Sequence, residues 1–314
     1  MAQDYRNIQK SVFSAEFKNF CRKELCSKLN KLENVRILHI IGMILCCIIG
    51  SALIIGVIYV DFSGIYKVSE GLFKITVLIG IGSIVSAEII RKDYKTRAKD
   101  IILEKLLSFI GDFKINDDKN IENHIAELKL FDKFNRFYCD DRLSGNYKLL
   151  NLDIAQLDLR YVTGSGKNRH EKIVFQGILI KLPNMKKYKS NCYTIIRQHS
   201  LFNFENRNRV HLEDIEFEKY YDVYSDDQIE ARYMLTTSFM ERMTQLAKKG
   251  IGQNIKMSFE NGNIYIAVSS AKDWFEIPIF SPASKIENFR AIVLEIITLL
   301  KIIDALNLDR KIGL

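Results

Sequence analysis

The stretch ILHIIGMILCCIIGSALIIGVIYV, residues 37–60, decides the class of this protein, because it holds no formal charge at neutral pH. As an α-helix it would be about 36 Å long, against a bilayer hydrocarbon core of about 30 Å. A signal peptide would not follow so long a hydrophilic segment, and a core helix of this length would have a polar face. The stretch therefore predicts a transmembrane helix.

A second apolar segment, residues 71–90, carries Lys74 and Glu88 near its two ends. Long charged side chains at such positions reach the membrane interface, and each has a helical neighbour of opposite sign. We expect interfacial ion pairs, with an intramembrane functional role for Glu88 as the alternative. Together the two spans predict a transmembrane hairpin, whose membrane-flank charges are Lys74, Glu88, Arg91 and Lys92.

The formal charge of +8 is concentrated beside this hairpin. Residues 1–36 hold eight basic and four acidic side chains, residues 91–105 hold six and three, and residues 106–314 hold thirty and twenty-eight. A nucleic-acid-binding domain would carry its basic residues on a folded face, so we expect no nucleic-acid partner. Basic flanks stay in the cytoplasm, so the distribution predicts a multi-pass protein with both termini cytoplasmic.

Small residues recur at four-residue spacing on both spans, as at Gly42, Cys46 and Gly50 and again at Gly82 and Ser86. Such spacing lets helix backbones approach closely in lipid. We expect the two spans to pack on each other, with a homo-oligomer contact as the alternative.

The rest of the chain has patterns typical of helices and strands in the order expected of an α+β protein. We expect a cytoplasmic basic helical segment over 1–36, which lies on the membrane or forms a stalk arm, and a helical linker or stalk over 91–119. Residues 120–314 are then a cytoplasmic α+β domain, a mostly antiparallel sheet with packed helices. The periodicity predicts helices at 121–138, 225–246 and 285–306, and strands at 149–161, 173–182, 192–198, 210–212, 217–224, 254–259, 264–269 and 274–279. A phase shift near Gln156 predicts a β-bulge, and Asn261-Gly262 predicts a hairpin turn between the strands at 254–259 and 264–269.

The helix expected at 225–246 has a strong start signal. Ser225 fits the N-cap, Asp226 and Asp227 fit the positive end of the helix dipole, and Gln228 fits a capping box. Glu230 and Arg232 are not explained by capping, and we expect a salt bridge from them into the strands.

No catalytic signature emerges from the motifs. Residues 164–167, Gly-Ser-Gly-Lys, lack the spacing of a phosphate loop and predict a hairpin turn. The histidines show no metal-binding spacing, and the cysteines form no zinc set, so we expect neither metal nor cofactor. A site combining His211 with Asp140 remains the basis of an alternative, a membrane-tethered, hydrolase-like enzyme.

The string VYSDDQIEARY, residues 223–233, resembles the bacterial membrane-protein family of unknown function numbered thirty-one thirty-seven. The resemblance extends over about residues 130–280 and includes Phe175-Gln176-Gly177, where the family usually has Lys in place of Gln176. The residues of the string that we single out as a motif are Ser225, Asp226, Asp227, Gln228, Glu230, Arg232 and Tyr233.

The resemblance implies a bacterial inner-membrane location and no reaction. It also implies an envelope protein of the LemA type as a partner. We therefore expect a membrane-anchored interaction or scaffold module whose other partner is the lipid bilayer, with the membrane-tethered enzyme as the alternative.

Overall fold

The computed structural model describes residues 5–63, 69–118, 121–148, 150–184, 193–198, 208–250, 255–282 and 284–308, and it contains a nine-stranded antiparallel sheet. The strand order is β1-β2-β3-β4-β9-β8-β5-β7-β6. Their bounds are β1 Lys114–Ile115, β2 Arg136–Tyr147, β3 Leu150–Thr163, β4 His170–Pro183, β5 Tyr193–Gln198, β6 Arg209–Val210, β7 Tyr221–Ser225, β8 Ile255–Glu260 and β9 Asn263–Ser269. The predicted α+β class with antiparallel strands is confirmed.

The chain divides into two compact units. The sheet unit comprises Met1–Lys10, Leu107–Trp274 and Leu294–Leu314, and the helical unit comprises Ser11–Leu106 and Phe275–Val293.

Two predicted turns join strands of the sheet as expected. Residues 164–169 connect β3 to β4, and Asn261 and Gly262, at φ 53° and 70°, close the β8–β9 hairpin. Positive φ at both central residues is typical of the tight turn that Asn-Gly favours. The bulge predicted near Gln156 is present in the β2–β3 pair, since Cys139 pairs with Leu157 and Arg142 pairs with Ala155, which leaves two residues of β2 opposite Gln156. A second register shift lies between β3 and β4 at Leu159/Arg160.

Helices cover both faces of the sheet. On one face, called the α5 face here, α5 (Glu122–Glu127) packs with Phe131 and Leu157 in a core that includes Tyr265. On the opposite face, Phe239 of α8 (Thr237–Lys248) meets Phe259 of β8 edge to face, with ring centroids 5.9 Å apart. The C-terminal part of α9 (Ile286–Ala305) also belongs to this unit, where Asp304 accepts hydrogen bonds from Tyr147 at 2.9 Å and Lys148 at 2.6 Å.

Four predicted elements differ in the structure. The helix expected over 121–138 ends at Glu127, because residues from Arg136 onward join the sheet as β2. The strand expected over 217–224 starts as a short helix, α6 (Ile215–Glu218), capped by Asp214, before β7.

The other two differences lie farther along the chain. The helix expected over 225–246 is two helices, α7 (Gln228–Met234) and α8, because Leu235 leaves helical geometry and Thr236 caps the second one. Residues 274–279 form no strand, since their buried side chains pack without a β-partner and Pro278 has no N–H to donate.

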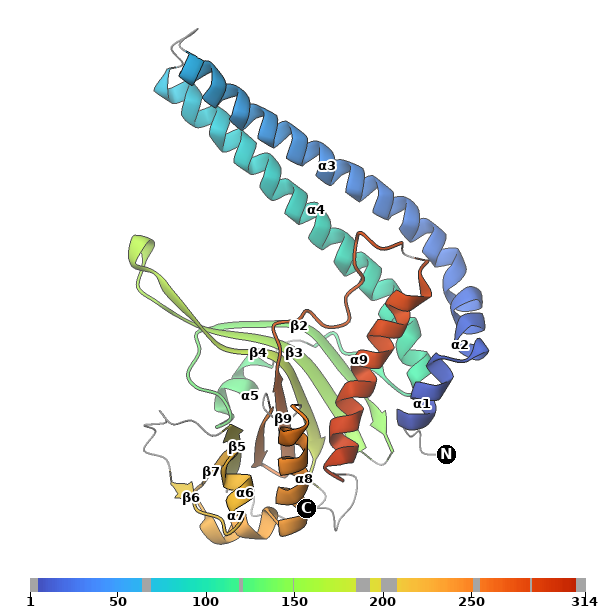
Figure 1. Ribbon diagram of the computed structural model, residues 1–314, viewed down its shortest axis with the longest axis vertical. Helices are drawn as coiled ribbons and strands as arrows, with labels where there is room; N and C mark the ends of the chain where they lie inside the picture. The colour runs from blue at the N-terminus through green and yellow to red at the C-terminus, as the bar shows by residue number, and fades with distance from the viewer. Residues whose placement is uncertain are drawn as a thin grey trace. The chain divides into compact units, whose positions relative to one another are not determined.

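The helical unit is built around two long helices that run side by side (Figure 1). These are α3 (Cys26–Ser63) and α4 (Glu70–Ile110), of which α4 belongs to this unit as far as Leu106. They approach most closely where two glycines face each other: a Cβ on Gly50 would lie 2.7 Å from the carbonyl oxygen of Gly80, and one on Gly80 would lie 2.6 Å from Ile54. The predicted packing of the two helices on each other is therefore present, with Gly80 as the partner of Gly50.

The lower part of the helical unit has a buried core. It includes Phe17 of α2 (Ala15–Phe20), Cys21 of the π-helical turn Cys21–Leu25, and Ile102 of α4. α1 (Tyr5–Val12) ends in this unit with Val12 fully buried. The segment after Trp274 is fastened here, since Arg36 donates to the carbonyl of Ile279 at 3.0 Å and Lys95 pairs with Glu276.

Candidate functional site

The membrane-flank charges lie at the two ends of the apolar part of the hairpin. Lys74 is 3.5 Å from Glu70, and Glu88 accepts a hydrogen bond from Arg91 Nε at 2.8 Å. Lys92 is exposed, and its carbonyl accepts from Thr96. A functional role for these charges stays a prediction.

A second group of polar residues lies just beyond them, which sequence patterns did not single out. His39 Nε2 lies 3.0 Å from Asp93, and Asp93 also accepts from Arg97 Nε at 3.0 Å. The hydrogen bonds from His39 and Arg97 hold the pKa of Asp93 below its usual value. Beside it, burial raises the pKa of Tyr94 to about 12. The pattern that could have predicted the contact is a His near the end of one span and an Asp after the other.

The motif at 225–233 joins a helix to the sheet. The prediction that Ser225 is the N-cap of α7 is wrong. Ser225 lies in β7, and its hydroxyl donates to the Tyr193 carbonyl at 2.7 Å. Asp227 is the N-cap, and its carboxylate accepts from the backbone N–H groups of Ile229 at 2.9 Å and Glu230 at 3.0 Å. Two successive N–H groups on one carboxylate are typical of an Asp N-cap.

The remaining motif residues also have structural contacts. Asp226 accepts from the backbone N–H of Tyr193 at 3.0 Å, which ties β5 to the start of α7. Arg232 donates to the carbonyl of His211 at 3.1 Å and to that of Gln228 at 3.3 Å. Tyr233 is half exposed. These contacts give the motif an architectural role, and whether it has a further function stays a prediction.

The His211–Asp140 pair does not form a site. His211 follows β6 at one edge of the sheet, and Asp140 belongs to β2 near the other edge, with six strands between them. His211 is exposed and has Glu218 at 3.9 Å. Within the described ranges, no cluster of three His, Cys, Asp or Glu side chains could hold a metal ion.

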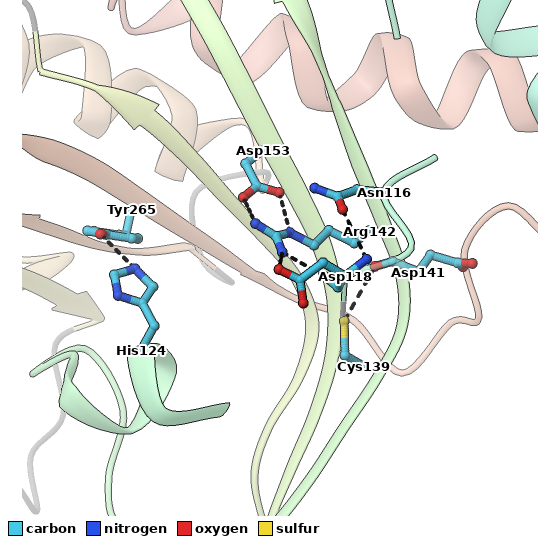
Figure 2. A network of polar contacts seen from close by, with 8 residues as sticks. All are labelled: Asn116, Asp118, His124, Cys139, Asp141, Arg142, Asp153 and Tyr265. Atoms are coloured by element: carbon cyan, nitrogen blue, oxygen red, sulfur yellow. Dashed lines mark hydrogen bonds and ion pairs between the residues drawn. The ribbon is translucent and has the colours of Figure 1, made fainter. Parts of the chain in front are cut away.

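A cluster of polar side chains lies on the α5 face of the sheet (Figure 2). Arg142 of β2 donates two hydrogen bonds to the carboxylate of Asp153 of β3, from Nε to Oδ1 at 2.9 Å and from Nη2 to Oδ2 at 2.6 Å. Its remaining nitrogen, Nη1, donates to the carbonyl of Asp118 at 2.6 Å. The bidentate bond to Asp153 raises the pKa of Arg142 above its usual value.

Next to this pair, Tyr265 of β9 meets His124 of α5, with the phenol oxygen 3.1 Å from His124 Nε2 (Figure 2). Burial, followed by the neighbouring Lys181 ammonium, lowers the pKa of His124, so the imidazole is neutral at pH 7. Burial raises the pKa of Tyr265 to about 12. Both side chains are therefore uncharged hydrogen-bonding groups, and the charges of the cluster come from Arg142, Asp153 and Lys181.

Two adjoining hollows open on this cluster. A recess of about 40 Å³ is lined by residues that include His124, Arg142 and Tyr265. A larger groove of about 380 Å³ is lined by Ser144, Asn151, Leu152, Asp153, Lys181, Leu182, Pro183 and Asn263. Asp153 and Lys181 line both hollows, so the two adjoin along these side chains and combine apolar walls with a few polar groups. Sequence reasoning missed this surface, because its residues come from separate strands with no shared motif.

Known proteins give one family and one similar structure. Residues 173–308 match the family model described as "Protein of unknown function (DUF3137)". The crystal structure of the mycobacterial trehalose monomycolate transport factor A, TtfA, is 14% identical, with a TM-score of 0.35, and covers 66% of this chain and 96% of that chain. No curated protein matches the sequence. The matched family model is that of the family that the sequence resembles, and the match lies farther toward the C-terminus than the resemblance at about 130–280.

Proposed function

We propose that this protein is a multi-pass bacterial inner-membrane protein in which the α3–α4 hairpin anchors a cytoplasmic α+β interaction module. The observation that carries the proposal is the apolar surface of α3 and α4. Large aliphatic side chains are exposed along both helices between Ile37 and Ile89, for example Ile55 at 66% and Leu78 at 74%. Burying one such side chain is worth about 1.5–3 kcal/mol, so a surface of this extent strongly favours a lipid surrounding over water.

The polar groups of the two spans support the same proposal. The hydroxyls of Ser51, Thr76 and Ser86 each donate to the backbone carbonyl four residues earlier, at 2.7, 2.9 and 2.9 Å. Lipid offers no hydrogen-bonding partner, so a spanning helix must satisfy its polar groups internally. Both helices are long and apolar enough to cross a membrane.

The proposed topology places both termini in the cytoplasm, since the basic flanks precede the first span and follow the second. The proposed domains are 1–36, the hairpin at 37–90, the stalk at 91–119 and the α+β domain at 120–314. Reporter fusions after Ser63 and at the C-terminus test this arrangement. The expected result is a periplasmic signal from the first fusion and a cytoplasmic signal from the second, and a periplasmic C-terminus would contradict the proposal.

The interaction role is proposed together with a partner class, an envelope protein of the LemA type, and a second copy of this chain is the alternative partner. Photo-reactive residues at Ile229 and Tyr233, which are 79% and 51% exposed, would probe the α7 region in intact membranes. A probe at the exposed Lys172 is the control. A crosslink to a LemA-type protein from α7 alone supports the role, whereas catalytic turnover by the purified protein without a partner would contradict it.

A further inference from the structure

The groove on the α5 face brings together side chains from four strands. Ser144, Asp153, Lys181 and Tyr265 are register partners across β2, β3, β4 and β9, so they lie in one row on one face. A residue two positions along a strand points to the same face, which places Asn151 and Asn263 in the next row. The result is a polar surface of two rows at one end of the sheet.

The charges of this surface are unevenly compensated. Both carboxylate oxygens of Asp153 are occupied by Arg142, at 2.9 and 2.6 Å. The Lys181 ammonium lies 5.9 Å from the centre of the Tyr265 ring, and no carboxylate of the described residues forms a salt bridge with it. Lys181 is therefore the charge that the groove has available for a ligand.

Neutral hydrogen-bonding groups surround this ammonium. Within the described part of the chain, the side chains of Ser144 and Asn151 make no hydrogen bond to the protein, so a hydroxyl and a carboxamide face the groove unused. The Asn263 amide nitrogen donates to the carbonyl of Asn261 at 2.9 Å, which leaves its carbonyl oxygen as an acceptor. The groove thus offers one positive charge with donors and acceptors on both sides of it.

The chemistry and size of the groove select a class of ligand. Arginine recognises planar carboxylates in bidentate fashion, but the guanidinium here already holds Asp153. A lysine acts as a point charge with three rotatable donors, which suits a tetrahedral phosphate. The groove volume of about 380 Å³ lies within the range of small-molecule sites, whereas the recess of about 40 Å³ has space for water only.

We propose that this groove binds a small phosphate ester that carries hydroxyl groups, with Lys181 contacting the phosphate and Ser144, Asn151 and Asn263 contacting the hydroxyls. The ester comes either from a soluble metabolite or from the headgroup of an anionic lipid. This inference concerns the sheet unit alone and does not rest on the membrane anchor proposed above.

The test is calorimetric titration of the full-length protein in phosphatidylcholine nanodiscs with glycerol 3-phosphate, inorganic phosphate and glycerol. We expect saturable binding of glycerol 3-phosphate, weaker binding of phosphate and none of glycerol. Lys181→Gln should weaken the binding of glycerol 3-phosphate by about tenfold or more. Lys172→Gln, which removes the same charge from an exposed position on the same strand, should leave it unchanged.

Two further variants separate phosphate binding from hydroxyl binding. Ser144→Ala and Asn151→Ala should each weaken the binding of glycerol 3-phosphate by a few fold. The affinity for inorganic phosphate should not change, because inorganic phosphate lacks the glycerol hydroxyl groups that these two side chains contact. Unchanged tryptophan fluorescence of each variant shows that it is folded. The proposal is overturned if glycerol 3-phosphate shows no saturation up to about 10 mM, or if Lys181→Gln binds it as the parent protein does.

The source of the ester is decided by the host lipid. If the headgroup occupies the groove, phosphatidylglycerol in the nanodisc should compete with glycerol 3-phosphate and raise its apparent Kd, and Lys181→Gln should abolish that competition. If the ester is a soluble metabolite, the apparent Kd should not depend on the lipid.

Discussion

The replacement Gly177→Ala should strongly destabilise the sheet unit. Gly177 lies at φ 150° in β4, and an added Cβ would be 2.1 Å from the backbone carbonyl oxygen of Val268 in β9. Ordinary contact needs about 3.5 Å, so the end of β9 must move by more than about 1 Å. Such a shift breaks the hydrogen bond from Ser270 N to the Gln176 carbonyl, which is 2.9 Å long.

The magnitude follows from these two effects. Strained backbone at a residue with a side chain costs about 1–3 kcal/mol, and one or two lost ladder hydrogen bonds cost about 1 kcal/mol each. We therefore expect Gly177→Ala to lower the free energy of unfolding by about 3–5 kcal/mol. For a unit of this size that corresponds to a fall in Tm of about 10 °C.

The chain offers both a reporter and a matched control for this measurement. Trp274 is the single tryptophan and is 8% exposed, so its fluorescence follows unfolding of the sheet unit. Gly166, in the turn between β3 and β4, has φ 56°, but no atom lies within 4 Å of an added Cβ. Gly166→Ala should therefore cost only about 1–2 kcal/mol. Equal losses at the two sites would refute the steric argument.

Three other predictions follow from the same contacts. Asp227→Ala should lower the stability of the sheet unit by about 1 kcal/mol, measured by Trp274 fluorescence, because two N–H groups of α7 lose their acceptor; Gln228→Ala, at an exposed position, is the control, and an equal effect of both would show that the cap is not the cause. Gly50→Ile should weaken the packing of α3 on α4 by about 1–3 kcal/mol, whereas Gly56→Ile, at a position with open space around it, should not. The measurement is energy transfer between dyes at Asn34 and Asp100 during SDS titration. Similar behaviour of the two variants would contradict the close approach of the helices. Tyr265 should lose its proton only near pH 12, so its contribution to stability should be complete below about pH 10 and decline as the pH rises toward 12; Tyr265→Phe should flatten this decline, and an unchanged alkaline profile would rule out the assignment.

Much of the fold follows from local patterns. The Asn-Gly turn, the strand at β9 and the last helix, α9, were predictable because hydrophobic period and turn chemistry act over a few residues. The prediction failed where neighbours overrode that pattern. The helical spacing of apolar residues from Ile121 to Phe134 predicted a helix as far as residue 138, yet pairing with β3 makes Arg136 to Tyr138 part of a strand.

The motif at 225–233 shows the same limit. Its composition predicted the start of a helix, and α7 does start there. Which side chain caps it depended on β5, because Tyr193 engages Ser225 and so leaves Asp227 to accept from the first turn of α7.

The amino-acid order alone was sufficient to indicate an apolar hairpin with basic flanks, since charge and hydrophobicity are summed along a continuous segment. The groove beside Lys181 depended on tertiary structure, because its residues come from β2, β3, β4 and β9 and are separated by up to 119 positions, from Ser144 to Asn263. Only the register of the antiparallel pairs places them on one face, and only the bidentate bond between Arg142 and Asp153 leaves Lys181 as the charge available there. Register is a property of paired strands, so no single strand carries the information for this site.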